Sequence, residues 1–184
     1  MGLETAGDEL HLQPLAFVVY LLTFSCYGAR LRGDEKGSVD RARKGRSGSI
    51  EPSIGLMNYG RSVMTHPEAR LELSEALTVL TAIRETCRLR RWTLLGAHVR
   101  STHVHMVVDG IIETSRAIRD LKAYASRALN GNGTRRRWAR GGNALLLRDS
   151  KAVYAAIRYV VDGQGPRMAA YVATELFDRV HDHR

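Results

Sequence analysis

The chain has few cysteines and no long apolar run. These two features limit the cellular compartments in which we expect to find it. Its 184 residues include two cysteines, Cys26 and Cys87, which are too few for a disulfide framework or a cysteine-based metal site. We expect each to be a small buried apolar residue. The apolar stretch from Pro14 to Cys26 is too short to cross a bilayer. The residues before it lack the basic flank of a signal peptide and are acidic instead, at Glu4, Asp8 and Glu9. The sequence therefore predicts a cytoplasmic protein without a membrane segment.

Acidic residues are also in short supply. The chain has 28 lysines and arginines against 19 aspartates and glutamates, which gives a formal net charge of +9. Such an excess favours a polyanionic partner, most commonly nucleic acid. The excess is concentrated between Thr114 and Arg148, where Asp120 is the one acid among nine basic residues: Arg116, Arg119, Lys122, Arg127, Arg135, Arg136, Arg137, Arg140 and Arg148. We expect this segment to bind a nucleic-acid backbone, with a merely solvated face as the alternative.

Length and patterning predict one α+β domain over residues 1–184. A run of β-branched and aromatic residues at 15–26 predicts a buried strand, and the Gly-, Ser- and Arg-rich stretch at about 28–61 predicts a long flexible loop. A capping box from Thr65 to Glu68 predicts a helix that continues to about Leu89. Further strands are expected at 92–99 and 103–109, and further helices at 114–130 and 151–162. This order fits a ferredoxin-like (split βαβ) antiparallel sheet with helices packed on it.

The strongest chemical signal is a pair of histidines one residue apart, in the run Thr102-His103-Val104-His105-Met106. Side chains alternate along a strand, so His103 and His105 project from one face and their apolar neighbours from the other. Two adjacent imidazoles are a natural start for a divalent-metal site. We expect the apolar face to pack under the first helix. The histidine face should then meet the second helix, or an open cleft beside it.

A tight hairpin would enlarge this cluster. If Ser101-Thr102 forms a two-residue turn, Arg100 lies opposite His103 and His98 lies opposite His105. Three imidazoles and a guanidinium on one face make a poor apolar core, which favours a functional site. A register shift of one residue would remove His98 and Arg100 from the face.

The predicted helix 114–130 contains Tyr124, at the edge of an apolar stripe formed by Ile118, Leu121 and Ala125. By itself such a tyrosine is usually a structural anchor. Its place just after the histidine pair favours a role as a nucleophile.

At this point the sequence resembles the single-tyrosine transposases of the His-hydrophobic-His (HUH) family, in particular their REP-associated tyrosine transposase branch. His103-Val104-His105 matches the motif that names the family, and Lys122-Ala-Tyr124 falls where the nucleophile helix is expected. The resemblance extends over most of the chain, through segments 23–28, 33–39, 138–142 and 159–165.

The resemblance implies an enzyme that cleaves and rejoins single-stranded DNA, often beside a hairpin. A divalent cation, Mg²⁺ or Mn²⁺, would be held by His103 and His105, and Tyr124 would form a 5′-phosphotyrosine link. Such an enzyme would work in the cytoplasm at the nucleoid, as a monomer or homodimer. The residues expected to hold DNA are Arg100, Arg116, Arg119, Lys122, Arg127, Arg135, Arg136, Arg137 and Trp138, the last by stacking on a base or, equally, as a core contact.

One position departs from the family pattern. The residue one helical turn after Tyr124 is Ala128, where the family commonly has a Gln or Asn as third metal ligand. His98 is our candidate for completing the site. The alternative is a catalytically weakened relative that binds hairpin DNA or RNA. A third interpretation, a different metal enzyme built on His181 and His183, is disfavoured because these residues end the chain and a tail there is usually frayed.

Overall fold

An antiparallel sheet forms the centre of the computed structural model, which describes residues 18–35, 38–39, 49–130 and 135–173. The five strands lie in the order β6-β1-β5-β4-β7. They are β1 (Val19–Ser25), β4 (Thr93–Val99), β5 (His103–Asp109), β6 (Asn143–Leu147) and β7 (Ala169–Val172). β1 and β4 both run antiparallel to β5, which lies between them, and β1 separates β5 from β6 in the same way. This is the predicted split βαβ arrangement, and β7 extends it at the β4 edge.

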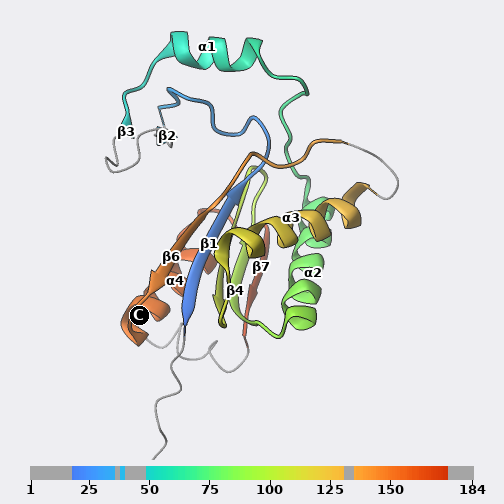
Figure 1. The fold of residues 1–184 in the computed structure, drawn as a ribbon, viewed down its shortest axis with the longest axis vertical. Helices are drawn as coiled ribbons and strands as arrows, with labels where there is room; N and C mark the ends of the chain where they lie inside the picture. Colours follow the sequence, from blue (N-terminus) through green and yellow to red (C-terminus); the bar gives the residue numbers. More distant parts are fainter. Residues whose placement is uncertain (1–17, 36–37, 40–48, 131–134, 174–184) are drawn as a thin grey trace, which may run out of the picture.

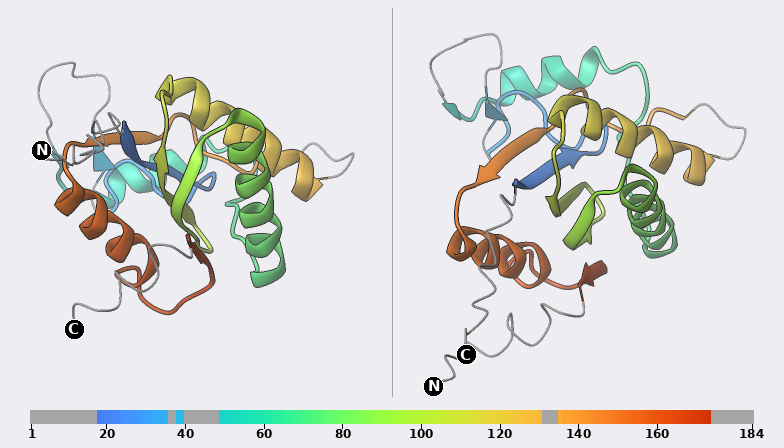
Figure 2. Two further views of the ribbon diagram at one scale, coloured as in Figure 1. Left: turned by 90° about the horizontal axis from the view of Figure 1, so that it is seen from below. Right: turned by 60° about the horizontal axis from the view of Figure 1, so that its bottom comes forward.

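Two helices cover one face of the sheet. They are α2 (Leu73–Arg90) and α3 (Thr114–Asn130), and they pack against each other as well as on the strands. Figures 1 and 2 show both on the same side. The strand residues beneath them are apolar and buried, and include Phe24, Val104 and Met106. The main hydrophobic core therefore lies on this face.

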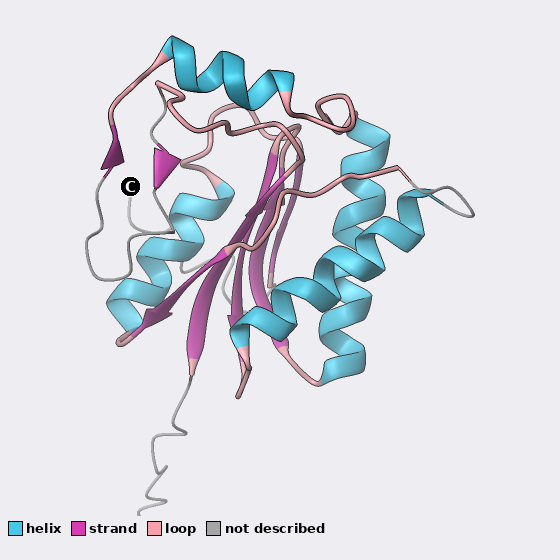
Figure 3. Ribbon diagram, turned by 45° about the horizontal axis from the view of Figure 1, so that its top comes forward, coloured by secondary structure: helices cyan, strands magenta, loops and turns pink. Residues whose placement is uncertain are grey.

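The opposite face is covered differently. Helix α4 (Ser150–Val161) packs there through Ile157 and Val160 onto Val19, Val107 and Leu147, which together form a smaller apolar cluster. Figure 3 shows α4 on the other side of the sheet from α2 and α3. Beyond one end of the strands lie helix α1 (Ile54–Ser62) and the short pair β2 (Ser38–Val39) and β3 (Ser49–Ile50).

The predicted elements need three corrections. Residues 54–62 form α1, with Ser53 as its N-cap, inside the stretch predicted to be a loop. Helix α2 begins at Leu73 with a capping box between Glu72 and Glu75, and not at Thr65. The segment before it stays extended because Ala69 and Leu71 donate their backbone N–H groups to Tyr27 and Ser101. Strands β2, β3, β6 and β7 were not predicted, since all four are short; β2 and β3 lie inside the predicted loop.

Two further expectations, on α3 and on the cysteines, are confirmed. Helix α3 has the predicted bounds. Cys26 and Cys87 are buried and unpaired, and burial raises the pKa of each thiol to about 12. Within the described part of the chain, no helix is both long enough and apolar enough to span a membrane.

Candidate active site

The histidine pair lies on the face of the sheet that α4 covers. His105 is paired with His98 across the β4–β5 hairpin, and the Arg100 N–H donates to the His103 carbonyl. The predicted hairpin register is therefore correct. The imidazole rings of His103 and His105 lie edge to face, with centroids 4.8 Å apart. Two half-buried imidazoles thus stand together at the end of the sheet.

Neighbouring hydroxyls orient both rings. The Nδ1 atom of His105 is hydrogen-bonded to Thr23 Oγ1 at 2.9 Å, and Nδ1 of His103 to Thr102 Oγ1 at 3.0 Å. A hydroxyl both donates and accepts, so either histidine can hold its proton on Nδ1 and present the lone pair of Nε2. Partners of this kind fix the ring orientation of metal-binding histidines.

A glutamine that was not among the predicted site residues supplies a third side chain suited to bind a metal. Gln164 Oε1 lies 3.4 Å from His103 Nε2, and the Gln164 Nε2 group donates to the Tyr159 carbonyl at 3.3 Å. This second bond keeps the amide oxygen turned toward the histidine. Two imidazoles and one amide oxygen are suitable ligands for a divalent cation such as Mn²⁺.

Both histidines are held in the neutral form. Burial, together with the nearby charges of His103, Arg30 and Arg100, lowers the pKa of His105 to about 4. The pKa of His103 is also lowered, first by burial and then by Arg100 and Arg30, and the hydrogen bond that its Nε2 donates to the Gln164 amide oxygen opposes this shift. Neutral imidazoles can coordinate a metal without releasing a proton.

His98 does not supply the third ligand. It is fully buried, its Nε2 accepts the Met168 N–H at 3.1 Å, and its Nδ1 donates to the Val160 carbonyl at 3.1 Å. Both ring nitrogens are therefore used by the backbone. His98 joins α4 to the segment before β7, and the expectation that it binds metal is not supported.

Tyr159, on α4, is the tyrosine beside the pair. Its ring centroid lies 5.7 Å from that of His105, and 48% of the residue is exposed. Tyr124 instead lies on α3, across the sheet, with the Arg127 guanidinium 4.4 Å above its ring. The structure does not bring Tyr124 to the histidines, and the expectation that the histidine face meets the second helix is wrong.

Chain topology explains the difference. The connections from β1 to β4 and from β5 to β6 are crossovers between parallel strands, and right-handed crossovers of this order place α2 and α3 on one face. The histidine face remains for α4. The run Tyr159-Val-Val-Asp-Gly-Gln-Gly165 carried the missing signal, a tyrosine followed within two helical turns by an amide.

The predicted DNA-binding residues separate into two groups. Trp138 is buried against Phe24, and its Nε1 donates to the Lys122 carbonyl and Ser126 Oγ, so it is a core residue. Arg137 is buried with Glu75 and Asn130. The Lys122 amine donates to the carbonyls of Ala139 and Gly141.

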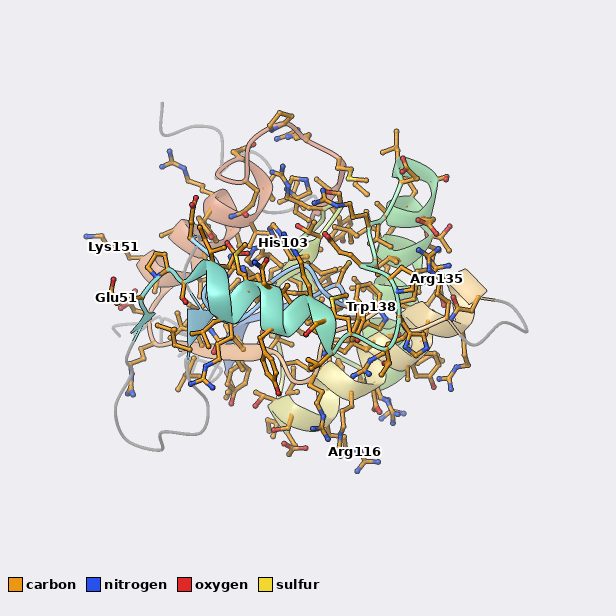
Figure 4. All side chains as sticks on the ribbon, turned by 90° about the horizontal axis from the view of Figure 1, so that it is seen from above. Glu51, His103, Arg116, Arg135, Trp138 and Lys151 are labelled. Carbon is orange, nitrogen blue, oxygen red and sulfur yellow. The ribbon has the colours of Figure 1, made fainter. Side chains whose placement is uncertain are left out.

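Five of the remaining basic residues are exposed, whereas Arg100 is half-buried. The three on α3, Arg116, Arg119 and Arg127, lie on the far side of the sheet from His103, as Figure 4 shows for Arg116. Arg135 and Arg136 follow α3, and the Arg136 guanidinium lies 4.5 Å from the centroid of the Tyr27 ring. Arg100 alone of the predicted set lies at the histidines. The exposed arginines of α3 and the histidine pair thus lie on different faces of the sheet.

Conventional metal ligands are sparse. Across the described ranges, no group of three His, Cys, Asp or Glu side chains is arranged to hold a metal ion. The Gln164 amide oxygen, which lies beside His103, could serve as a third protein ligand for a cation at the histidine pair. His181 and His183 lie outside the described residues.

Comparison with known proteins shows a similarity to a solved structure. No family model and no curated protein matches the chain. A solved structure of a REP-associated tyrosine transposase bound to a REP hairpin is similar at 13% identity and a TM-score of 0.49, over 79% of this chain and 66% of that one. This chain thus spans slightly less than two thirds of that protein. A similarity of this size carries no argument about activity.

Proposed function

We propose that the protein cleaves and rejoins single-stranded DNA, with Tyr159 as the nucleophile. The observation that carries the proposal is the joint placement of a half-exposed tyrosine and an amide beside a histidine pair. The Tyr159 ring contacts His105, and Gln164 links the Tyr159 backbone to His103. A phosphate bound at the imidazoles would lie within reach of the phenol.

The reaction is a transesterification. The Tyr159 oxygen attacks the phosphorus, a phenolic O–P bond forms and the P–O3′ bond breaks. The proton of the phenol ends on the departing 3′ oxygen. The products are a 5′-phosphotyrosine link and a free 3′-OH, and attack by a 3′-OH reverses the step without an external energy source.

His103, His105 and Gln164 would hold a divalent cation, Mn²⁺ or Mg²⁺. When bound, the cation would polarise the scissile phosphate. The hydroxyls of Thr23 and Thr102 keep the imidazoles in place. Because nitrogen ligands suit Mn²⁺ better than Mg²⁺, we expect greater activity with Mn²⁺.

The substrate would be single-stranded DNA with a nearby hairpin, bound by a cytoplasmic, nucleoid-associated monomer or homodimer. The exposed arginines of α3 would bind the hairpin backbone, at a surface distant from the reacting phosphate. Binding should then weaken steeply with salt.

The two tyrosines provide a matched test. Labelled single-stranded hairpin DNA is incubated with Mn²⁺ and the wild type, Tyr159→Phe or Tyr124→Phe, and denaturing gels detect covalent adducts. We expect the adduct to disappear in Tyr159→Phe and to persist in Tyr124→Phe. The reverse result would restore Tyr124 as the nucleophile.

A non-catalytic binding protein is the second candidate. It is favoured by the arginines around the histidines, which oppose a cation, and because no Asp or Glu among the described residues joins the two histidines in a metal-binding group. Salt-sensitive DNA or RNA binding by the wild type, without any adduct, would support it.

A further inference from the structure

Arg100 is the residue that neither the fold nor the proposed cleavage step explains. It follows β4, and its N–H donates to the His103 carbonyl at 2.9 Å. Residues paired in this way share a face of the sheet, so Arg100 and His103 project to the same side. Its guanidinium nitrogen Nη1 is buried and has no hydrogen-bond partner among the described residues.

The loop after α4 lies directly over this guanidinium. A Cβ atom at Gly165 would lie 3.4 Å from Arg100 Nη1 and 3.8 Å from Nη2, and Gly165 has a φ of +77°. Glycine adopts this left-handed conformation without strain. The backbone that carries Gln164 to His103 therefore also covers Arg100.

A cavity of about 1080 Å³ adjoins this point, with Arg100, His103, Ser25 and Arg30 among its lining residues. Carboxylates of Asp34, Glu35 and Glu68 also line it, and Glu68 is paired with Arg70. No described carboxylate forms an ion pair with Arg100. An unpaired buried donor of this kind costs stability unless a ligand satisfies it.

We propose that Arg100 binds a phosphate group beside the histidine pair, directly and without a cation. Guanidinium donors match the oxygens of phosphate in both charge and geometry. The proposal rests on the proposed function only in naming nucleic acid as the source of that phosphate. A bound phosphate would offset the charges of Arg100 and Arg30, so cation binding at the histidines becomes more favourable once it is present.

The first test uses inorganic phosphate as the probe, in EDTA and at constant ionic strength, with the imidazole NMR signals of His103 as readout. We expect a saturable shift that chloride does not produce. In Arg100→Gln the affinity should fall about tenfold, the loss typical of one charge-assisted hydrogen bond, and Arg100→Lys should retain part of it. Arg88→Gln, at an exposed position of α2, removes the same charge and should leave the affinity unchanged. Equal affinities in the wild type and Arg100→Gln would overturn the proposal.

The second test measures Mn²⁺ affinity by calorimetry without DNA. Because the guanidinium repels a cation, Arg100→Gln should bind Mn²⁺ several-fold more tightly than the wild type. A purely structural Arg100 would instead give unchanged or weaker Mn²⁺ binding, and that outcome contradicts the proposal.

Neither readout requires DNA cleavage. Phosphate binding that depends on Arg100 in a protein that forms no adduct would support this inference and refute the proposed function. An adduct that depends on Tyr159, together with phosphate binding that does not depend on Arg100, would support the proposed function and refute this inference.

Discussion

The two faces of β5 have the same backbone and opposite uses. On one face, Val104, Met106 and Val108 are fully buried beneath α2 and α3. On the other, only Val107 joins the apolar cluster under α4, while His103 and His105 remain half-buried among Thr23, Gln164 and Tyr159. One face is covered along its length and the other only in part. The partly covered face leaves polar side chains both oriented and accessible.

The largest expected effects come from substituting adjacent residues on the two faces. Met106→Ala should lower the free energy of unfolding by about 2–5 kcal/mol, because it leaves a cavity in the main core. His105→Ala should change it by less than about 1 kcal/mol, the net value of one hydrogen bond, yet abolish the DNA adduct. Urea unfolding and adduct assays measure the two effects. Equal destabilisation by both substitutions would remove the contrast between the faces.

His98 should be an exception to this contrast, because it lies on the histidine face but stabilises the folded structure. His98→Leu leaves the Val160 carbonyl and Met168 N–H without their partner and should cost about 1–3 kcal/mol. Burial lowers the pKa of His98 in the folded state, as it does for His103 and His105. Unfolding therefore takes up protons below the unfolded value of about 6.5.

The free energy of unfolding should accordingly be highest above that pH. It should decline as the pH falls toward 4, near the folded pKa of His105. Urea unfolding at several pH values checks this trend, and the decline should be shallower in His98→Leu. Greater stability in acid would contradict it.

Trp138 tests whether the core face also contacts DNA. Trp138→Phe keeps the contact with Phe24 but removes the Nε1 donor, so we expect a loss of about 0.5–1.5 kcal/mol and unchanged DNA affinity. A large fall in affinity at constant stability would return Trp138 to the DNA-binding set.

The smallest effect is expected on α3. Replacing Arg116 and Arg119 with glutamine should leave stability and phosphate binding at Arg100 unchanged, since both side chains are exposed across the sheet from His103. The slope of log affinity against log salt concentration for hairpin binding should become shallower, by the amount that corresponds to the loss of up to about two phosphate contacts. An unchanged salt slope would mean that this face is only solvated.

Local rules predicted much of this protein. The alternation of His103, Val104, His105 and Met106 determined which side chains share a face, and the short turn at Ser101-Thr102 set the register that places Arg100 beside His103. The apolar stripe of α3 predicted a helix, and the glycines at 131 and 133 predicted where it ends. The segments that were missed depend on distant partners: residues 65–72 look like a helix start but are hydrogen-bonded to Tyr27 and Ser101.

The sequence by itself determined that two imidazoles stand together, because that follows from the two-residue period of a strand. Only the tertiary structure decided which helix covers them. The handedness of the two crossovers places α3, and Tyr124 with it, on the opposite face, and leaves the histidines to α4 with Tyr159 and Gln164. The tertiary structure also buries Arg137 and Trp138, whose basic and aromatic character had suggested DNA contact. Spacing along the chain gives no information on which side of a sheet a distant helix will pack, since that choice depends on chain connectivity and on the apolar surface each helix must bury.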